Sequence, residues 1–467
     1  MNPPLFVVVG RVNKGKSSIV ATLSEDESVP IDPEPGTTRE SRTYTVRVDG
    51  RPLFGLVDTP GFQDAPAALE EMRRDEFSAA DRRRAVEAFV ARHEKDGGFP
   101  EECRLLRPVL DGGRILYVVD GGVPYARNYE AEMEILRWTG RPRMALVNRI
   151  GPRDHADAWK SALGQYFNLV RDFDANRAGF EERMRLLESF RELDEEARPQ
   201  LDAAVRALRD ERARRRREAA RAIADLLARA LTHRVELELA PHEGMDDRRP
   251  QAEERLRDEV RSIEKDAHRR ILELYGHRRL RVDASDLDVA ALRQDLFAEA
   301  TWRMFGLTHV QALLAGAAGG ATLGALLDLK LGGATFMAGL VLGSLLGAGT
   351  AAWGSAKKLG SSGNALKALG GRRVARYGPI RHVLFASVLL DRALLHYRLA
   401  AHRAHSVRAD ARPEQDEAAV SIVRTLSTRE RSRLQRLTGR LSRRPDDVSD
   451  AHVRDLREWI ESLLGEL

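Results

Sequence analysis

The sequence predicts an α/β domain with a mostly parallel sheet, followed by an all-α region that contains a glycine-rich hydrophobic hairpin. An apolar run at residues 5–9 leads directly into a glycine-rich turn and a helix-favouring segment. Further apolar runs alternate with helical patterns as far as residue 178, and strands that alternate with helices form parallel sheets covered on both faces. From residue 179 the chain is charged and favours helices, except in the apolar stretch at 306–355.

The turn after the first strand reads GRVNKGKS, from Gly10 to Ser17, and matches the G-x-x-x-x-G-K-S pattern of a phosphate-binding P-loop. The glycines of such a loop let backbone N–H groups point at a phosphate, and the N-terminus of the next helix favours negative charge. Lys16 is expected to reach the β- and γ-phosphates, and the Ser17 hydroxyl to hold Mg²⁺. Further nucleotide contacts are expected from Gly10, Asn13, Lys14, Gly15 and Ser18.

Two downstream segments supply the parts that a P-loop needs. Residues 54–58 form a predicted strand that ends in the sequence DTPG, from Asp58 to Gly61. Asp58 would act on the metal through a water, and the Gly61 N–H would contact the γ-phosphate. The polar residues 35–40 suit a loop in which Thr38 closes on Mg²⁺ only when the γ-phosphate is present. The order and spacing of these motifs indicate binding of a nucleoside triphosphate.

The motifs GRVNKGKSS, GTTR and DTPG resemble those of the Era and TrmE group of translation-factor-like P-loop GTPases, over residues 1–175. The resemblance implies that the chain binds GTP and GDP and hydrolyses GTP. It implies that Ser17, Thr38 and Asp58 hold Mg²⁺. It also implies that catalysis depends on Lys16, Thr38 and Gly61. A homodimer through the switch regions, residues 35–40 (switch I) and Asp58–Gly61 (switch II), is a further expectation.

Two positions refine the expected mechanism. Phe62 stands where Ras-type enzymes carry a glutamine that positions the attacking water, so intrinsic hydrolysis should be slow or need another group. Gln63 and Asp64 are close enough in sequence to be considered. Asn13 matches the P-loop asparagine that helps bind K⁺ in the TrmE group, and K⁺ there would neutralise developing charge. The alternative is that Asn13 only shapes the loop.

The base-reading motif departs from the family pattern. The family motif N-K-x-D appears here as NRIG, from Asn148 to Gly151. Asn148 is in place and Arg149 can stack over the base, but the carboxylate that accepts two hydrogen bonds from guanine is missing. Asp154 or Asp157 could substitute for it. The remaining motifs favour GTP over ATP, and the last loop around the nucleotide is expected to include Asp174 and Ala175.

Several elements complete this domain, which is predicted to span residues 1–178. Residues 62–112 form an unusually long insert, and its charged stretch at 67–95 has apolar positions at helical spacing. The insert either reports the nucleotide state or is a solvated helical decoration. The single cysteine excludes a disulfide framework and indicates a reducing cytoplasm.

The charged helical region is predicted to span residues 179–305. It contains a basic run from Arg212 to Arg217, and such clusters bind RNA or anionic lipid in some proteins. Acidic neighbours favour a solvated helix face instead. The sequence shows no RNA-binding module, and we therefore do not expect a nucleic-acid partner.

The apolar stretch at 306–355 is the second strong signal. Its glycines recur every fourth residue, which places them on one helix face where two backbones can approach closely; they are Gly316, Gly320, Gly324, Gly339, Gly343 and Gly347. Each arm of roughly 18–23 residues is long enough to cross a bilayer, and basic residues follow on what would be the cytoplasmic side. We expect insertion into membrane lipid. The alternative is a tightly packed hairpin inside a soluble helical domain.

The last predicted domain, residues 356–467, is helical from Leu366 onward, and its histidines His396, His402 and His405 are expected on the surface. The order of domains resembles a bacterial family of GTPases with an uncharacterised, glycine-rich C-terminal region of the DUF3482 type. The expected function is a membrane-associated GTPase switch in the bacterial cytoplasm, at the inner membrane. Alternatives are a dynamin-like membrane remodeler, an Era-like RNA-binding assembly factor and a scaffold that does not hydrolyse nucleotide.

Overall fold

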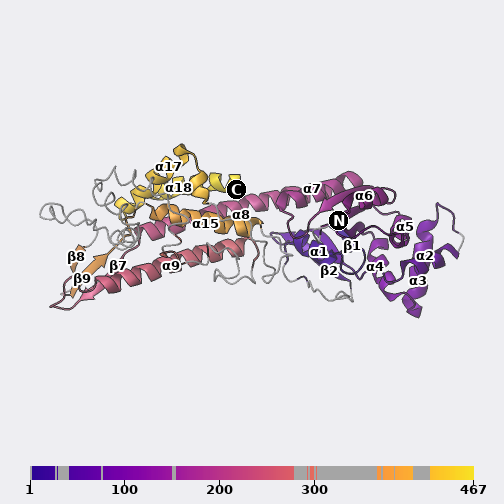
Figure 1. Ribbon diagram of the computed structural model, residues 1–467, viewed down its shortest axis with the longest axis horizontal. Coiled ribbons are helices and arrows are strands. Elements are labelled where there is room, and N and C mark those ends of the chain that lie inside the picture. The colour runs from indigo at the N-terminus through magenta and orange to yellow at the C-terminus, as the bar shows by residue number, and fades with distance from the viewer. Residues whose placement is uncertain are drawn as a thin grey trace. The chain divides into compact units, whose positions relative to one another are not determined.

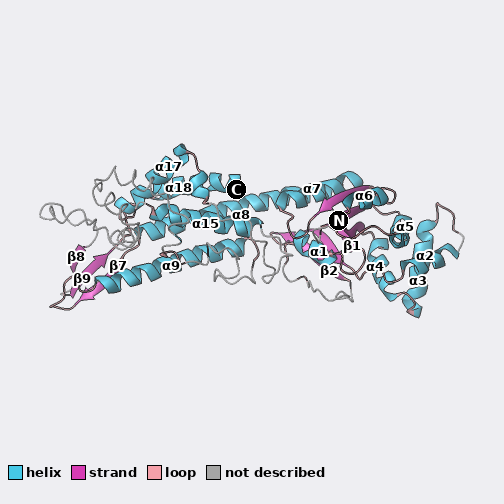
Figure 2. Cartoon of the chain, in the orientation of Figure 1, coloured by secondary structure: helices cyan, strands magenta, loops and turns pink. Residues whose placement is uncertain are grey.

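The computed structural model describes most of the chain in two compact units (Figures 1 and 2). The described residues are 3–26, 29, 41–74, 77–149, 154–277, 292, 295–298, 301, 365–369, 372–382, 384–402 and 421–467. Unit 1 comprises Met1–Ala213 and His402–Arg408, and unit 2 comprises Arg214–Ala401 and Ala409–Leu467. The boundary between them after Ala213 falls within one long helix, α8 (Arg198–Thr232).

Unit 1 is built on a six-stranded sheet in the order β2-β3-β1-β4-β5-β6. Its strands are β1 (Leu5–Val9), β2 (Arg42–Val48), β3 (Arg51–Asp58), β4 (Arg114–Asp120), β5 (Arg143–Asn148) and β6 (Leu169–Phe173). All neighbouring strands are parallel except β2 and β3, which are antiparallel. The α/β prediction with a mostly parallel sheet is therefore confirmed.

Helices cover both faces of this sheet. They are α1 (Lys16–Ser24), α2 (Ala65–Arg74), α3 (Arg82–Asp96), α4 (Pro100–Leu110), the short 3₁₀ helix η1 (Arg127–Tyr129), α5 (Glu130–Trp138), α6 (Ala156–Leu163) and α7 (Phe180–Leu193). Alternate side chains of β1 point to opposite faces. Val7 and Val9 pack with the cluster that includes α2 to α6, and Phe6 and Val8 pack with α1 and α7. The insert at 62–112 contributes α2, α3 and α4, of which α2 and α3 lie beside α5 (Figure 1).

Unit 2 is mainly helical. Its helices are the remainder of α8, α9 (Arg249–Leu274), α15 (Phe385–His402), α16 (Ile422–Thr425), α17 (Thr428–Arg443) and α18 (Asp450–Glu466). They share one hydrophobic cluster, in which Trp459 is the largest fully buried side chain. Helix α15 is apolar along most of its length and lies almost entirely within that cluster.

A three-stranded antiparallel sheet corrects the prediction that this region is all α. The strands are β7 (Val235–Leu239), β8 (Ala365–Leu369) and β9 (Arg372–Tyr377), in the order β7-β9-β8. The sequence VELEL of β7 alternates apolar and acidic residues, and its apolar face is buried. Such short strands beside long helices are hard to tell from helical sequence. The prediction of helix from Leu366 was wrong for the same reason.

The glycine-rich hairpin predicted at 306–355 lies outside the described residues. Among the residues that the structure describes, no helix is both long and apolar enough to cross a membrane. The domain limits predicted at residues 178, 305 and 355 stay a prediction.

Candidate nucleotide site

The P-loop connects β1 to α1 through backbone conformations that its sequence makes accessible. Gly10, Asn13 and Gly15 have φ values of 140°, 60° and 81°, a region that glycine and, less often, asparagine adopt at low cost. A Cβ atom at Gly10 would lie 2.4 Å from the carbonyl oxygen of Val118 in β4. Glycine is thus required at this position by close packing as well as by conformation.

Lys16 opens α1 and is almost completely buried, with 7% of its surface exposed. Its Nζ donates a hydrogen bond to the carbonyl oxygen of Arg11, within the loop, at 2.9 Å. Burial lowers the pKa of Lys16 to about 8, although the nearby carboxylates of Asp58 and Glu132 act in the opposite direction. The negative charge of a bound phosphate would strongly stabilise the charged form of an ammonium group that is buried in this way.

Ser17 and Asp58 meet beside this lysine. Parallel pairing of β1 with β3 aligns Val8 with Asp58, and the Ser17 hydroxyl donates to Asp58 Oδ2 at 2.7 Å. The Thr59 hydroxyl donates to the carbonyl oxygen of Val8 at 2.7 Å and fixes the end of β3. A hydroxyl and a carboxylate at the phosphate end of a P-loop are oxygen ligands of the kind that Mg²⁺ prefers, so the donor set fits this metal.

Gly61 of switch II lies directly on the P-loop. A Cβ atom at this residue would come within 2.7 Å of the Val12 backbone nitrogen, so only glycine allows this approach. Phe62, the next residue, is 5% exposed and packs in the core with α2. It therefore cannot act on a water at the site. Thr38, the predicted switch I ligand, lies outside the described residues.

Asn148 ties three segments of the site together. Its Nδ2 donates to the carbonyl oxygen of Lys14 in the P-loop at 3.2 Å, and its Oδ1 accepts from the Ala175 N–H at 3.2 Å. In the loop that begins at Asp174, the Asp174 carboxylate accepts a hydrogen bond from the Asn176 N–H at 2.9 Å. The predicted last loop thus lies next to the P-loop.

The remaining predicted contacts differ in their surroundings. Arg149 faces Asp154 at 3.6 Å, and both side chains are more than half exposed. Asp154 also accepts from the Ala156 N–H at 3.0 Å, which leaves it at the start of α6 close to Arg149. Asp157 is exposed in α6, and Ser18 is half-buried in α1. Gly151 lies outside the described residues.

Sequence reasoning missed a buried carboxylate behind the P-loop. Glu132 of α5 is 1% exposed and pairs with the Arg11 guanidinium, while the Tyr117 hydroxyl donates to its Oε2 at 2.9 Å. Burial raises the pKa of Glu132, against the opposing effect of Arg11. Arg11 also lies 3.8 Å from the centre of the Tyr129 ring. Glu132 is one of several acidic residues in a charged helix, so the sequence gives no signal that singles it out.

Asp120, at the end of β4, was also missed. Its Oδ2 lies 3.5 Å from Lys14 Nζ, and its Oδ1 accepts from the Gly122 N–H at 2.9 Å. The position was foreseeable, because the carboxyl ends of parallel strands meet at the edge where ligands bind. The Lys14 side chain is thereby drawn toward the end of β4.

Comparison with known families divides the chain in two. The family described as 50S ribosome-binding GTPase matches residues 5–149, and the domain of unknown function DUF3482 matches residues 160–464. The chain belongs to the DUF3482 family. Its N-terminal part is an Era/TrmE-like P-loop GTPase domain, as the sequence motifs predicted.

Individual relatives of this DUF3482-family chain match about a third of its length. GTPase Der of Streptomyces coelicolor is 30% identical over 166 residues, which cover 35% of this chain and 30% of Der. The tRNA modification GTPase MnmE of Methylococcus capsulatus is 28% identical over 176 residues, which cover 35% of this chain and 38% of MnmE. The chain therefore spans about a third of the length of these relatives. A crystal structure of Aquifex aeolicus Era aligns with a TM-score of 0.27 and 16% identity, over 38% of this chain and 52% of Era.

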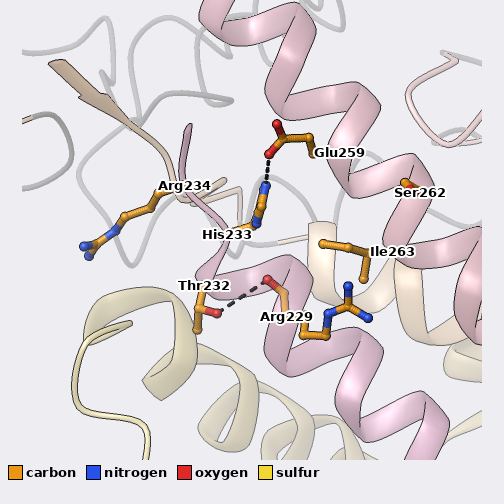
Figure 3. A pocket seen from close by; sticks show the side chains of 7 residues that line it. All are labelled: Arg229, Thr232, His233, Arg234, Glu259, Ser262 and Ile263. Atoms are coloured by element: carbon orange, nitrogen blue, oxygen red, sulfur yellow. Dashed lines mark hydrogen bonds and ion pairs between the residues drawn. The ribbon is translucent and has the colours of Figure 1, made fainter. Parts of the chain in front are cut away.

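The DUF3482 region holds a separate surface pocket of about 400 Å³ where α8 ends beside α9 (Figure 3). His233 and Glu259 face each other across it, with Nε2 and Oε2 2.5 Å apart, while Arg234 points away. The pocket is lined by Arg229, Thr232, His233, Arg234, Glu259, Ser262 and Ile263. None of the predicted nucleotide contacts lies here.

The histidine prediction is wrong at His396 of the DUF3482 region. This residue is 3% exposed, and its ring stacks on that of His268 with centroids 4.1 Å apart. Burial lowers the pKa of both imidazoles, that of His268 to about 3. His402 is exposed, and His405 lies outside the described residues. Within the described part of the chain, no group of three or more potential ligands could hold a metal ion.

Proposed function

We propose that this chain hydrolyses GTP to GDP and phosphate and acts as a nucleotide-controlled switch associated with a membrane. The observation that carries the hydrolytic part is the Ser17–Asp58 hydrogen bond beside the buried Lys16. These groups come from separate motifs and meet at the end of the P-loop, where a triphosphate would bind. The GTPase family match supports the same conclusion.

The residues of the site have distinct parts in this reaction. The charged Lys16 would stabilise the β- and γ-phosphates as the bond to the γ-phosphate breaks, and the loop N–H groups would accommodate the developing negative charge. Bound Mg²⁺ would supply Lewis-acid polarisation of the phosphate oxygens. Ser17 and Thr38 would hold this ion directly, and Asp58 through a water.

Hydrolysis is expected to be slow without a further group. Phe62 is buried in the core and cannot orient water, so a water attacking in line with the leaving phosphate lacks the usual glutamine. Asn13, exposed in the P-loop with φ of 60°, would hold K⁺ beside the phosphates. Its alternative role is to shape the loop alone.

The residues that would select the base lie at the ends of β5 and β6. Asn148 fixes the P-loop and the loop at Ala175, and the half-exposed Arg149 would cover one face of the base. Asp154, 3.6 Å from Arg149, or Asp157 would replace the missing guanine-reading aspartate. We therefore propose guanine over adenine.

The membrane part of the proposal rests on the glycine-rich sequence at 306–355. The GTPase domain would lie in the bacterial cytoplasm and the hairpin in the inner membrane, with a homodimer forming through the switch regions. Flotation of the full chain with vesicles tests this part. Vesicle-stimulated turnover with self-assembly would favour a dynamin-like remodeler, and RNA that co-purifies at high salt would favour an Era-like factor.

Release of phosphate under multiple turnover tests the hydrolytic part. The full chain should release phosphate from GTP faster than from ATP, and faster in KCl than in NaCl if Asn13 holds K⁺. The Lys16→Ala variant should lose the activity by about a hundredfold or more, because the main phosphate charge partner is gone. Nucleotide binding without any release would identify a scaffold that does not hydrolyse GTP.

A further inference from the structure

Helix α4 of the insert holds the backbone that follows switch II. Glu102 Oε1 accepts hydrogen bonds from the backbone N–H groups of Gln63 and Asp64, both at 2.8 Å. The residue is 2% exposed. Because two successive backbone N–H groups donate to one buried side-chain oxygen, this contact fixes the peptide that follows Phe62.

The two bonded amides lie next to the part of switch II that touches the P-loop. Gly61 packs on the backbone of Val12 so closely that no side chain would fit. One residue later, Phe62 is buried in the core, and the following two N–H groups are held by Glu102. Gly61 is therefore fixed from its C-terminal side by the insert.

The same helix also contacts the chain that follows switch I. The Ser41 hydroxyl donates to the carbonyl oxygen of Arg104 at 3.0 Å, and Ser41 comes three residues after Thr38 in the sequence. Beside this contact lies a cavity of about 710 Å³, lined in part by Ser41, Thr43, Cys103 and Arg104. Helix α4 thus contacts the residues that follow switch II and also Ser41, which follows switch I. The cavity lies beside the contact with Ser41.

A simpler explanation for Glu102 is that acidic residues stabilise the first turn of a helix. Glu101 and Glu102 both occupy the first turn of α4. Glu101 has a side chain 33% exposed and pairs with Arg104 at 3.6 Å in the same helix. Glu102 is buried and bonds to a segment 38 and 39 residues away. First-turn stabilisation accounts for Glu101 and not for the partners of Glu102.

We propose that Glu102 is a positioning residue, which holds Gly61 against the P-loop for contact with the γ-phosphate and couples the insert to the nucleotide state. The inference rests on the proposed function, since it concerns the response of switch II to GTP. GDP has no γ-phosphate and makes no contact with Gly61. Loss of Glu102 should therefore weaken steps that depend on GTP and leave binding of GDP nearly unchanged.

Variants of the full chain separate the positioning role from the helix-stabilising role. In Glu102→Ala the single-turnover rate of GTP hydrolysis should fall about tenfold or more, because misplacement near the reacting phosphate is costly. GDP affinity should stay within about twofold, since the GDP contacts are untouched. Glu102→Gln keeps an oxygen acceptor at the same reach and should retain most of the rate. Glu102→Asp keeps the charge but withdraws the acceptor, and should resemble Glu102→Ala.

Amide hydrogen exchange measures the contact itself. Exchange at Gln63 and Asp64 should accelerate about tenfold or more in Glu102→Ala and Glu102→Asp, because the N–H groups lose their acceptor. Glu101→Ala serves as the matched control and should behave as the unmodified chain in both measurements. If Glu102→Ala does not fold, the Glu102→Asp and Glu102→Gln pair carries the test.

Either of two results would overturn the inference: unchanged rate and exchange in Glu102→Ala, or Glu102→Asp resembling the unmodified chain while Glu102→Gln loses activity. The second pattern is that of a first-turn acid. Absence of GTP turnover in the unmodified chain would instead count against the proposed function. The exchange measurement would still report whether Glu102 holds the backbone that follows switch II.

Discussion

The Ser17 hydroxyl and the Asp58 carboxylate are joined by a hydrogen bond of 2.7 Å, although 41 residues separate them in the sequence. Pairing of β1 with β3 brings the two motifs together. Both groups offer oxygen atoms of the kind that Mg²⁺ prefers, and Ser17 would hold this ion directly and Asp58 through a water. The hydrogen bond holds the metal-binding groups in place before the metal arrives.

Removing the negative charge of Asp58 should therefore weaken the binding of Mg²⁺. In Asp58→Asn, the Mg²⁺ concentration that gives half-maximal GTP hydrolysis should rise about tenfold or more, because the charged group that would hold the metal through a water is replaced by a neutral one. A titration of the rate against Mg²⁺ measures this. Asp49→Asn changes an exposed turn residue between β2 and β3 and is the matched control. An unchanged Mg²⁺ requirement would contradict the assignment of Asp58.

The buried Lys16 predicts a pH dependence of nucleotide binding. Its pKa of about 8 in the free protein means that the side chain is charged below this pH and increasingly neutral above it. Phosphate favours the charged form and raises the pKa, so affinity should fall by up to about tenfold per pH unit above pH 8.

Calorimetry in buffers of different ionisation enthalpy checks this prediction. Binding of GDP should take up little proton at about pH 7 and a larger fraction of one proton at about pH 9. In Lys16→Arg the guanidinium stays charged throughout this range, and the uptake attributable to the side chain should vanish. Equal proton uptake at both pH values in the unmodified chain would refute a low pKa for Lys16.

The two hydrogen bonds of Asn148 predict a joint loss of stability and affinity. Asn148→Ala removes the bonds to the Lys14 carbonyl and to the Ala175 N–H. The free energy of unfolding should fall by about 1–3 kcal/mol, since a buried donor and acceptor lose their partners. Urea unfolding measures this loss, and a nucleotide titration should show weaker binding. Asn128→Ala, at an exposed side chain in η1, should change neither.

A buried ion pair in unit 2 predicts a loss of stability when one partner is removed. The side chains of Glu264 and Arg392 are 6% and 5% exposed and lie 2.6 Å apart. Glu264→Ala should lower the free energy of unfolding by about 3–5 kcal/mol, because it removes the carboxylate that pairs with the buried Arg392 guanidinium. Glu273→Ala, on the exposed side of α9, should have little effect. Restoration of stability when Arg392→Met is added would confirm the cause, and a small loss in Glu264→Ala would contradict it.

The parts of the fold that were predictable are those set by local sequence. The run at 5–9 and the P-loop predict a strand, a turn and a helix within one short segment, and Asn148 follows its strand directly. The order of the strands then places the P-loop and Asn148 at the same edge of the sheet. Short segments were misjudged: β7 is five residues long, and its alternation of apolar and acidic residues was overlooked between two long helices.

The supporting residues could not be predicted because their partners are distant in sequence. Glu102 bonds to residues 38 and 39 positions away, and Glu132 to an arginine 121 positions away. No periodicity distinguishes either from a solvated glutamate. His396 was misjudged for a related reason: His268, whose imidazole stacks on it, is distant in the sequence.

The central claim, that this chain is a guanine-nucleotide enzyme, is tested most directly by parallel titrations with fluorescent GTP and ATP. The titrations use the full chain with Mg²⁺ in KCl and in NaCl, with phosphate release followed in the same samples. We expect GTP to bind at least about tenfold more tightly than ATP, with phosphate released. Equal affinity for the two nucleotides, or no release in either salt, would contradict the assignment.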